Sequence, residues 1–188
     1  WGVYTGKAKL LLNVPIALAN SISASAVPAL SSCIASDNMK GARKRIGAAM
    51  RFTMIISFPC AAGLFVLADP IMNLLFSGET ALAAALIRAG AVTVMTYSVS
   101  TLSNGMLQGI GRMNLPVKNA AISLVLHLAS LIALMYYTEL GIYAVVISTL
   151  VFSLSMCLLN SLSLRHALSY RQEKGRTFLL PALSALVM

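Results

Sequence analysis

Residues 80–112 read TALAAALIRAGAVTVMTYSVSTLSNGMLQGIGR, and this stretch decides the fold. Its central part, 89–111, contains no Asp, Glu, Lys or Arg. About 20 mainly apolar residues are enough for an α-helix to cross the hydrocarbon core of a bilayer. A helix on the surface of a soluble protein would instead carry charges along one face. The stretch therefore predicts a membrane-spanning helix at about 81–110.

The same helix carries a polar stripe. Its members recur at steps of three or four residues, which places them on one helical face: Thr93, Tyr97, Ser100, Asn104 and Gln108. In a membrane protein such a face turns away from lipid, toward other helices or a watery cavity. We therefore expect these five side chains to line a substrate cavity.

The composition excludes most other classes of protein. The chain is 59% hydrophobic and only 10% charged, whereas soluble domains carry roughly 25% charged residues. The net charge of +9 comes from short cationic clusters between apolar runs, not from a basic face, so we expect no nucleic-acid partner. With five acids, two histidines and no catalytic motif, the sequence predicts no enzyme, no cofactor and no metal site.

The apolar runs predict an all-α, polytopic membrane bundle. The expected spanning helices lie at about 10–36, 46–68, 81–110, 117–138 and 141–164, with a truncated one at 177–188 and a short interfacial helix at about 70–77. The first residues, 1–9, read as the tail of a loop. Because the chain starts with Trp1 and stops inside an apolar run, we expect a single transmembrane domain, 1–188, that is a fragment of a longer protein.

Lysine and arginine are distributed unevenly between the predicted loops. Segments 37–51, 109–118 and 165–176 together hold eleven of the fourteen, and all three fall on the same side if the helices alternate. Short loops rich in Lys and Arg stay in the cytoplasm. The sequence therefore predicts that these three segments are cytoplasmic.

A second polar face lies on the first apolar run and includes Asn13, Asn20 and Ser31. It fits two interpretations, close packing between helices or the wall of a cavity. An unpaired amide facing lipid costs several kcal/mol. We therefore expect this face and the 93–108 stripe to line one shared hydrophilic cavity, with both Asn20 and Asn104 at its wall.

Two further residues are candidates for function. His127 lies in the middle of its helix and fits either a neutral histidine hydrogen-bonded within the bundle or a residue that couples proton movement. Arg88 fits either an anchor to lipid headgroups at the membrane interface or a ligand for an anion. Because the polar faces carry no acidic pair, a passage between them suits an anionic or sugar-bearing substrate.

Several short motifs resemble a known family. They are YTGKA at 4–8, NVP at 13–15, VPALS at 27–31, LQGIGR at 107–112 and LP at 115–116. In this order they resemble the polysaccharide-exporter branch of the multidrug/oligosaccharidyl-lipid/polysaccharide (MOP) flippase superfamily, and most closely its stage V sporulation protein B-like members.

The resemblance implies an architecture and an activity. The family has fourteen helices, in two lobes of six plus a terminal pair, so this chain would be part of the second, C-terminal lobe. It implies alternating access in the bacterial cytoplasmic membrane, with membrane lipids and the missing N-terminal lobe as partners. The expected substrate is an undecaprenyl-pyrophosphate-linked glycan for cell-wall, capsule or spore-envelope synthesis.

Two other functions remain open at this point. One is a cation-coupled multidrug exporter of the same superfamily, which would be favoured by a carboxylate deep in a helix. The other is a non-transporting membrane scaffold for envelope assembly. In the lipid II flippases, basic residues in a central cavity hold the pyrophosphate, but no Lys or Arg lies within the run at 10–36.

Overall fold

The structure is a computed structural model, and it describes residues 2–76 and 80–168. Its helices in chain order are a π-helical segment (Tyr4–Ala8), α1 (Lys9–Ala35), α2 (Met39–Val66), α3 (Ala68–Leu75), α4 (Ala81–Gly109), α5 (Asn114–Tyr137) and α6 (Tyr143–Leu168). The described residues contain no strand, and they include five helices long and apolar enough to cross a membrane. The predicted all-α polytopic bundle is confirmed. The helix expected at 177–188 lies outside the described residues.

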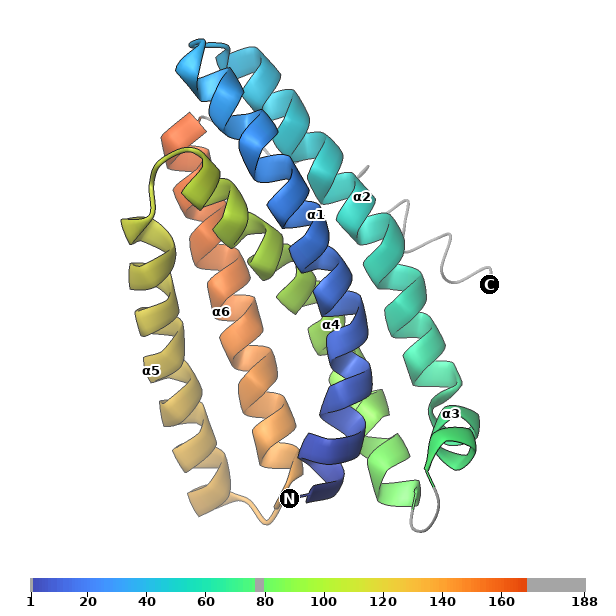
Figure 1. Cartoon of the computed structure of the whole chain (residues 1–188). Coiled ribbons are helices and arrows are strands. Elements are labelled where there is room, and N and C mark those ends of the chain that lie inside the picture. Colours follow the sequence, from blue (N-terminus) through green and yellow to red (C-terminus); the bar gives the residue numbers. More distant parts are fainter. Residues whose placement is uncertain (1, 77–79, 169–188) are drawn as a thin grey trace.

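Helix α4 is the centre of the bundle. It packs against α1, α2 and α6, while α5 packs mainly against α6 at the edge of the bundle (Figure 1). One buried cluster joins Leu102 and Leu107 of α4 to Ile46 of α2 and Leu164 of α6. The 80–112 stretch is therefore the helix around which the others are arranged.

Small residues let α1 approach α4 closely. A Cβ added at Gly105 would lie 1.8 Å from the Ser23 hydroxyl oxygen, and one at Gly90 would lie 2.6 Å from a methyl group of Leu12. Near the end of the same interface, the Ser31 hydroxyl donates a hydrogen bond to the Gly109 carbonyl at 2.8 Å. Apolar side chains gain little by leaving lipid for protein, so membrane helices associate through such close contacts.

The segment 37–51 is helical over most of its length and not a loop as predicted. Helix α2 begins at Met39, seven residues before the expected start at 46, so Lys40, Lys44 and Arg45 belong to its first turns. The Asn38 side chain caps the helix by accepting a hydrogen bond from the Gly41 N–H at 2.8 Å. The charges made this segment resemble a loop, but a helix can extend beyond the bilayer with charged residues.

Two other boundaries differ from the prediction for the same reason. The lead-in at 1–9 is helical from Gly2 and continues directly into α1. Helix α6 runs to Leu168, four residues into the segment predicted as a loop at 165–176. The Leu168 carbonyl accepts a hydrogen bond from Arg43 Nε of α2 at 2.6 Å, which ties the ends of these helices together.

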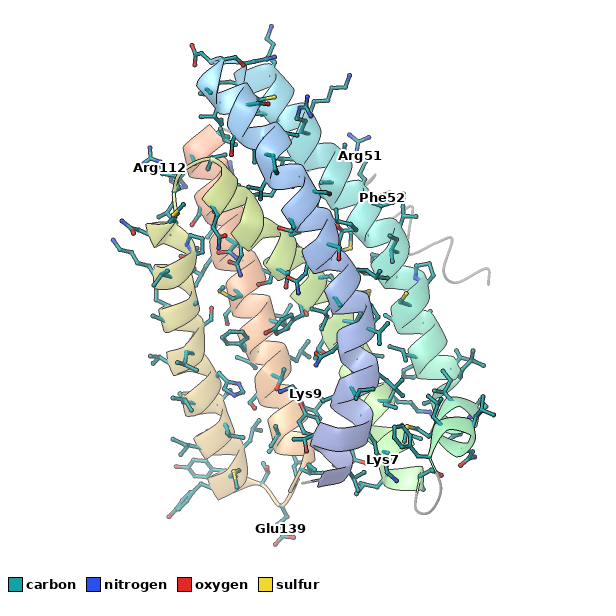
Figure 2. All side chains as sticks on the ribbon, viewed as in Figure 1. Lys7, Lys9, Arg51, Phe52, Arg112 and Glu139 are labelled. Carbon is teal, nitrogen blue, oxygen red and sulfur yellow. The ribbon has the colours of Figure 1, made fainter. Side chains whose placement is uncertain are left out.

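The chain turns alternate between the two ends of the bundle. The α1–α2 and α4–α5 turns lie at one end, and the α5–α6 turn lies at the other, with Arg112 and Glu139 at opposite ends (Figure 2). Gly111 has φ +76 in the α4–α5 turn, a conformation that other residues rarely adopt. We call the end with Arg112, Lys40 and Lys44 the basic end.

Replacing Gly105 by Leu should separate α1 from α4. The added side chain has no space beside Ser23, so we expect the variant to lose about 1–3 kcal/mol of stability, the usual cost of overpacking. Thermal unfolding in detergent would measure this loss. Gly63→Leu on α2 is the matched control, because a Cβ there meets nothing within 4 Å. Equal melting temperatures for the two variants would contradict the close α1–α4 contact.

Candidate functional site

A polar hollow lies between α1, α4 and α6. It has a volume of about 510 Å³, and we call it the amide cavity. Its polar lining includes Asn20, Ser23, Tyr97, Ser100, Asn104 and Gln108. The structure therefore places Asn20 of the first helix and four members of the α4 stripe around one hollow.

A second hollow adjoins the first and is lined by α5 and the π-helical segment as well as by α1, α4 and α6. This lysine cavity has a volume of about 260 Å³ and is lined by residues that include Lys9, Asn13, Thr93, His127 and Thr149. Tyr97 and Phe152 line both cavities, and their ring centroids lie 6.3 Å apart. The two cavities thus adjoin at an aromatic pair, and together we call them the polar groove.

The lining amides of the groove differ in their bonding. Asn20 and Gln108 are exposed and form no side-chain hydrogen bond with any described residue. Thr93 is buried, and its hydroxyl donates to the Gly90 carbonyl at 2.5 Å within α4. Ser31 lines neither cavity, because its hydroxyl is bonded to Gly109 at the α1–α4 contact. Asn13 of the lysine cavity is likewise exposed and without a described partner, so Asn13, Asn20 and Gln108 are the groove amides free to bond water or a ligand.

Asn104 belongs both to the groove and to a buried chain of amides. Its Oδ1 accepts from Asn160 Nδ2 at 2.7 Å, and Asn160 Oδ1 in turn accepts from Asn119 Nδ2 at 2.8 Å. Asn119 Nδ2 also donates to Ser163 Oγ at 3.0 Å. We call Asn104, Asn160 and Asn119 the amide chain. It joins α4, α6 and α5, and the spacing of residues within each helix could not show which amides would meet.

Lys9 is the groove residue that the sequence analysis missed. It was placed in a loop, whereas it begins α1 and lines the lysine cavity beside Asn13. Its spacing of four from Asn13 and eleven from Asn20 would have placed it on their face had the helix been extended. Lys7 differs in its surroundings, since its ammonium lies 5.4 Å from the centroid of the Phe76 ring. Figure 2 shows both lysines at the end of the bundle opposite Arg112.

His127 lies in the lysine cavity on α5. Its ring is 6.0 Å from that of Phe152 in an edge-on arrangement. Its Nδ1 is buried and has no hydrogen-bond partner within the described ranges. His127 is therefore not part of a hydrogen-bonded network with the described residues that surround it.

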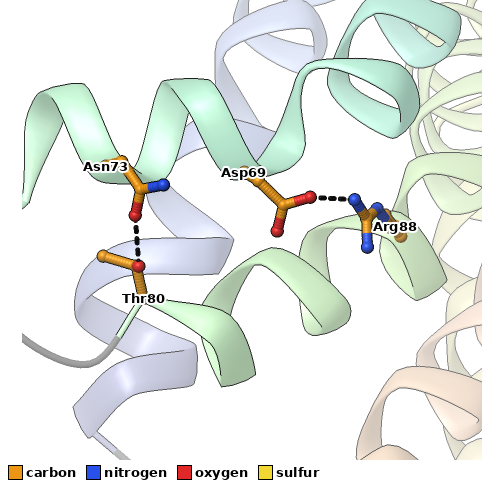
Figure 3. Close-up of polar contacts among 4 residues, drawn as sticks. All are labelled: Asp69, Asn73, Thr80 and Arg88. Atoms are coloured by element: carbon orange, nitrogen blue, oxygen red, sulfur yellow. Dashed lines mark hydrogen bonds and ion pairs between the residues drawn. The ribbon is translucent and has the colours of Figure 1, made fainter.

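Arg88 lies away from both cavities. Its guanidinium forms an ion pair with Asp69 of α3 (Figure 3). Four residues further along α3, Asn73 Oδ1 accepts a hydrogen bond from the Thr80 hydroxyl at 2.5 Å. Both charged side chains of the pair are more than 40% exposed, so the pair contributes little to stability. Arg88 therefore has a protein partner that the sequence analysis did not name.

The groove has the chemistry of a binding site for a neutral or anionic molecule. Its described lining contains amides, hydroxyls and one lysine, but no Asp or Glu. Over residues 2–76 and 80–168, no group of three His, Cys, Asp or Glu side chains could hold a metal ion. The arrangement can therefore bind sugar hydroxyls and phosphate oxygens.

Comparison with known proteins identifies the family. The family model for the lipid II flippase MurJ matches residues 4–188 of the chain. A comparison with curated proteins found no match to this chain. Because the match covers nearly the whole chain, the protein belongs to the MurJ family of lipid II flippases, which are multi-pass transporters of the cytoplasmic membrane and not enzymes.

Proposed function

We propose that this chain forms one lobe of a flippase that moves a pyrophosphate-linked glycan lipid across the membrane by alternating access. The observation that carries the proposal is the polar groove, which has a lysine toward one end and free amides along its length. Residues 1–188 would then be a single transmembrane domain, and a further lobe of the protein would close the groove from the other side.

The two parts of the groove suit two parts of such a substrate. A lysine ammonium binds phosphate oxygens through charge-assisted hydrogen bonds, so the pyrophosphate would lie near Lys9. Amides bond sugar hydroxyls as donors and acceptors, so the glycan would extend along Asn20 and Gln108. The substrate's polyprenyl tail would stay in the lipid.

The groove favours this function over the two alternatives. A cation-coupled drug exporter would be supported by a carboxylate in the groove, and its described lining has none. A scaffold has no use for free amides in a hollow. Family membership supports the peptidoglycan precursor lipid II as the substrate, and the stage V sporulation protein B-like motifs support a spore-envelope or capsule precursor as the second candidate.

We further propose that the basic end faces the cytoplasm. Cysteines substituted for Lys44 and Glu139, in a background without the three native cysteines, should react with an impermeant maleimide from opposite sides of the membrane. Lys44→Cys should be labelled only after the cells are opened, because positive loops stay inside. Both positions are exposed, so failure to label would not reflect burial. Labelling of Lys44→Cys in intact cells would reverse the proposed orientation.

Lys9→Gln should weaken binding of the pyrophosphate lipid by about tenfold or more, the usual effect of losing one charged hydrogen bond. Fluorescence quenching with labelled lipid in detergent would measure this in the full-length protein. Lys7→Gln is the matched control, since Lys7 lies over Phe76 outside the groove. Lys9→Arg should retain most of the affinity. Equal losses for Lys7→Gln and Lys9→Gln would show that general charge, not the groove, binds the lipid.

Asn20→Leu and Gln108→Leu should each lower the transport rate per folded molecule roughly threefold to tenfold, the cost of one or two neutral hydrogen bonds. Neither side chain has a described partner, so the fold should keep its melting temperature. Flipping into liposomes, normalised to folded protein, would measure the rate. Ser21→Leu, on the same helix but outside both cavities, is the control. Unchanged transport in both amide variants would remove the groove from the pathway.

A further inference from the structure

A third cavity lies at the basic end, outside the polar groove. It has a volume of about 390 Å³ and lies between the start of α5 and the last turns of α6. Arg112, Asn119, Leu162, Ser163 and His166 are among the residues that line it, and none of its lining residues belongs to the groove. We call it the basic-end cavity.

The charges around this cavity have one sign. An adjoining hollow of about 400 Å³ shares Arg112 with it and adds Lys118. Among the described residues, neither Arg112 nor Lys118 has a hydrogen-bond or ion-pair partner, and no Asp or Glu lines either hollow. The Nδ1 atom of His166 lies 3.1 Å from the Leu162 carbonyl, which leaves the other ring nitrogen available. The two adjoining hollows are therefore lined by two cations without a described partner and by a histidine.

The rest of the lining combines a polar floor with apolar walls. Asn119 is only 7% exposed and is held in place by its bonds to Asn160 and Ser163. Ser163 accepts one of these bonds, so its hydroxyl proton remains available to a ligand. Leu115 and Leu162 form the walls. Guanidinium, ammonium and hydroxyl groups bind phosphate oxygens, while leucine side chains suit an acyl chain.

The position of the cavity indicates the source of the phosphate. It lies at the ends of helices long enough to span a bilayer, which is the depth of lipid headgroups. We propose that the basic-end cavity binds the phosphate of an anionic membrane phospholipid, with its acyl chains along the leucines of α5 and α6. The amide chain lies between this cavity and the groove, so the site is separate from the proposed path of the transported lipid.

Native mass spectrometry of the full-length protein, titrated with phosphatidylglycerol, tests this proposal. Losing a charge-assisted hydrogen bond to phosphate usually weakens binding about tenfold or more, so Arg112→Gln combined with Lys118→Gln should weaken binding at least tenfold. Lys40→Gln combined with Lys44→Gln is the matched control, because both lysines are exposed at the same end but line neither hollow. The control should change the affinity less than about twofold.

Two ligand controls separate the sources of the same chemistry. Diacylglycerol, which lacks the phosphate, should not compete, and inorganic phosphate should compete only at much higher concentration, because it lacks the acyl chains. Equal losses in the two double variants, competition by diacylglycerol, or inorganic phosphate binding as tightly as the lipid would each overturn the proposal. Should the Arg112 variant fail to fold, Lys118→Gln alone, at an exposed position, carries the test against Lys44→Gln. Transport by the groove is measured separately, so either proposal can fail without the other.

Discussion

A polar group inside a bilayer must find its partner within the protein, and this constraint determines how the amides of the bundle are arranged. Asn160 is fully buried on α6 and is bonded on one side to Asn104 and on the other to Asn119. These bonds join three helices, and a contact of 2.7 Å between the hydroxyls of Thr96 and Ser153 adds a second polar link between α4 and α6. Asn20 and Gln108 have no such partner, and they border a hollow instead of lipid. Packing and cavity are thus two solutions to the same solvation requirement.

Hydropathy predicted the central helix well and the helix ends poorly, for a physical reason. The helix expected at 81–110 agrees with α4 almost to the residue, although its 29 residues also exceed the core thickness, because Arg88 is the one charged residue within it and the turn residues Gly111 and Arg112 follow its end. Helix α2 has 28 residues, about 42 Å at 1.5 Å each, against a hydrocarbon core of about 30 Å. Its first turns therefore lie outside the apolar layer and carry charges. The length of an apolar run indicates only the part of a helix that lies in the hydrocarbon core, and the helix can continue outside the core.

Helical spacing predicted which residues share a face, but it could not predict what each face meets. Asn20 and four members of the α4 stripe line the amide cavity, whereas Thr93 lines the lysine cavity. Ser31 lies on the same predicted face as Asn20, yet its hydroxyl bonds the Gly109 carbonyl, because α4 passes within hydrogen-bond distance of α1 at that point. The ion pair of Arg88 with Asp69 depends on how the short helix α3 folds back on α4. Such partners depend on how the helices pack, and the spacing of residues along one helix does not determine that packing.

The groove carries an uncompensated positive charge, because Lys9 differs in its surroundings from two other cations at the end opposite Arg112. Lys7 lies over the ring of Phe76, and Arg88 is paired with Asp69. Lys9, in contrast, has no hydrogen bond or ion pair with a described residue, and it is the one described cation that lines the groove. In surroundings of low dielectric constant, a charge without a counterion acts over a longer range than a paired one. The amides beyond it are neutral, so under the proposed function this single charge is the one that an anionic group of the substrate would meet in the groove.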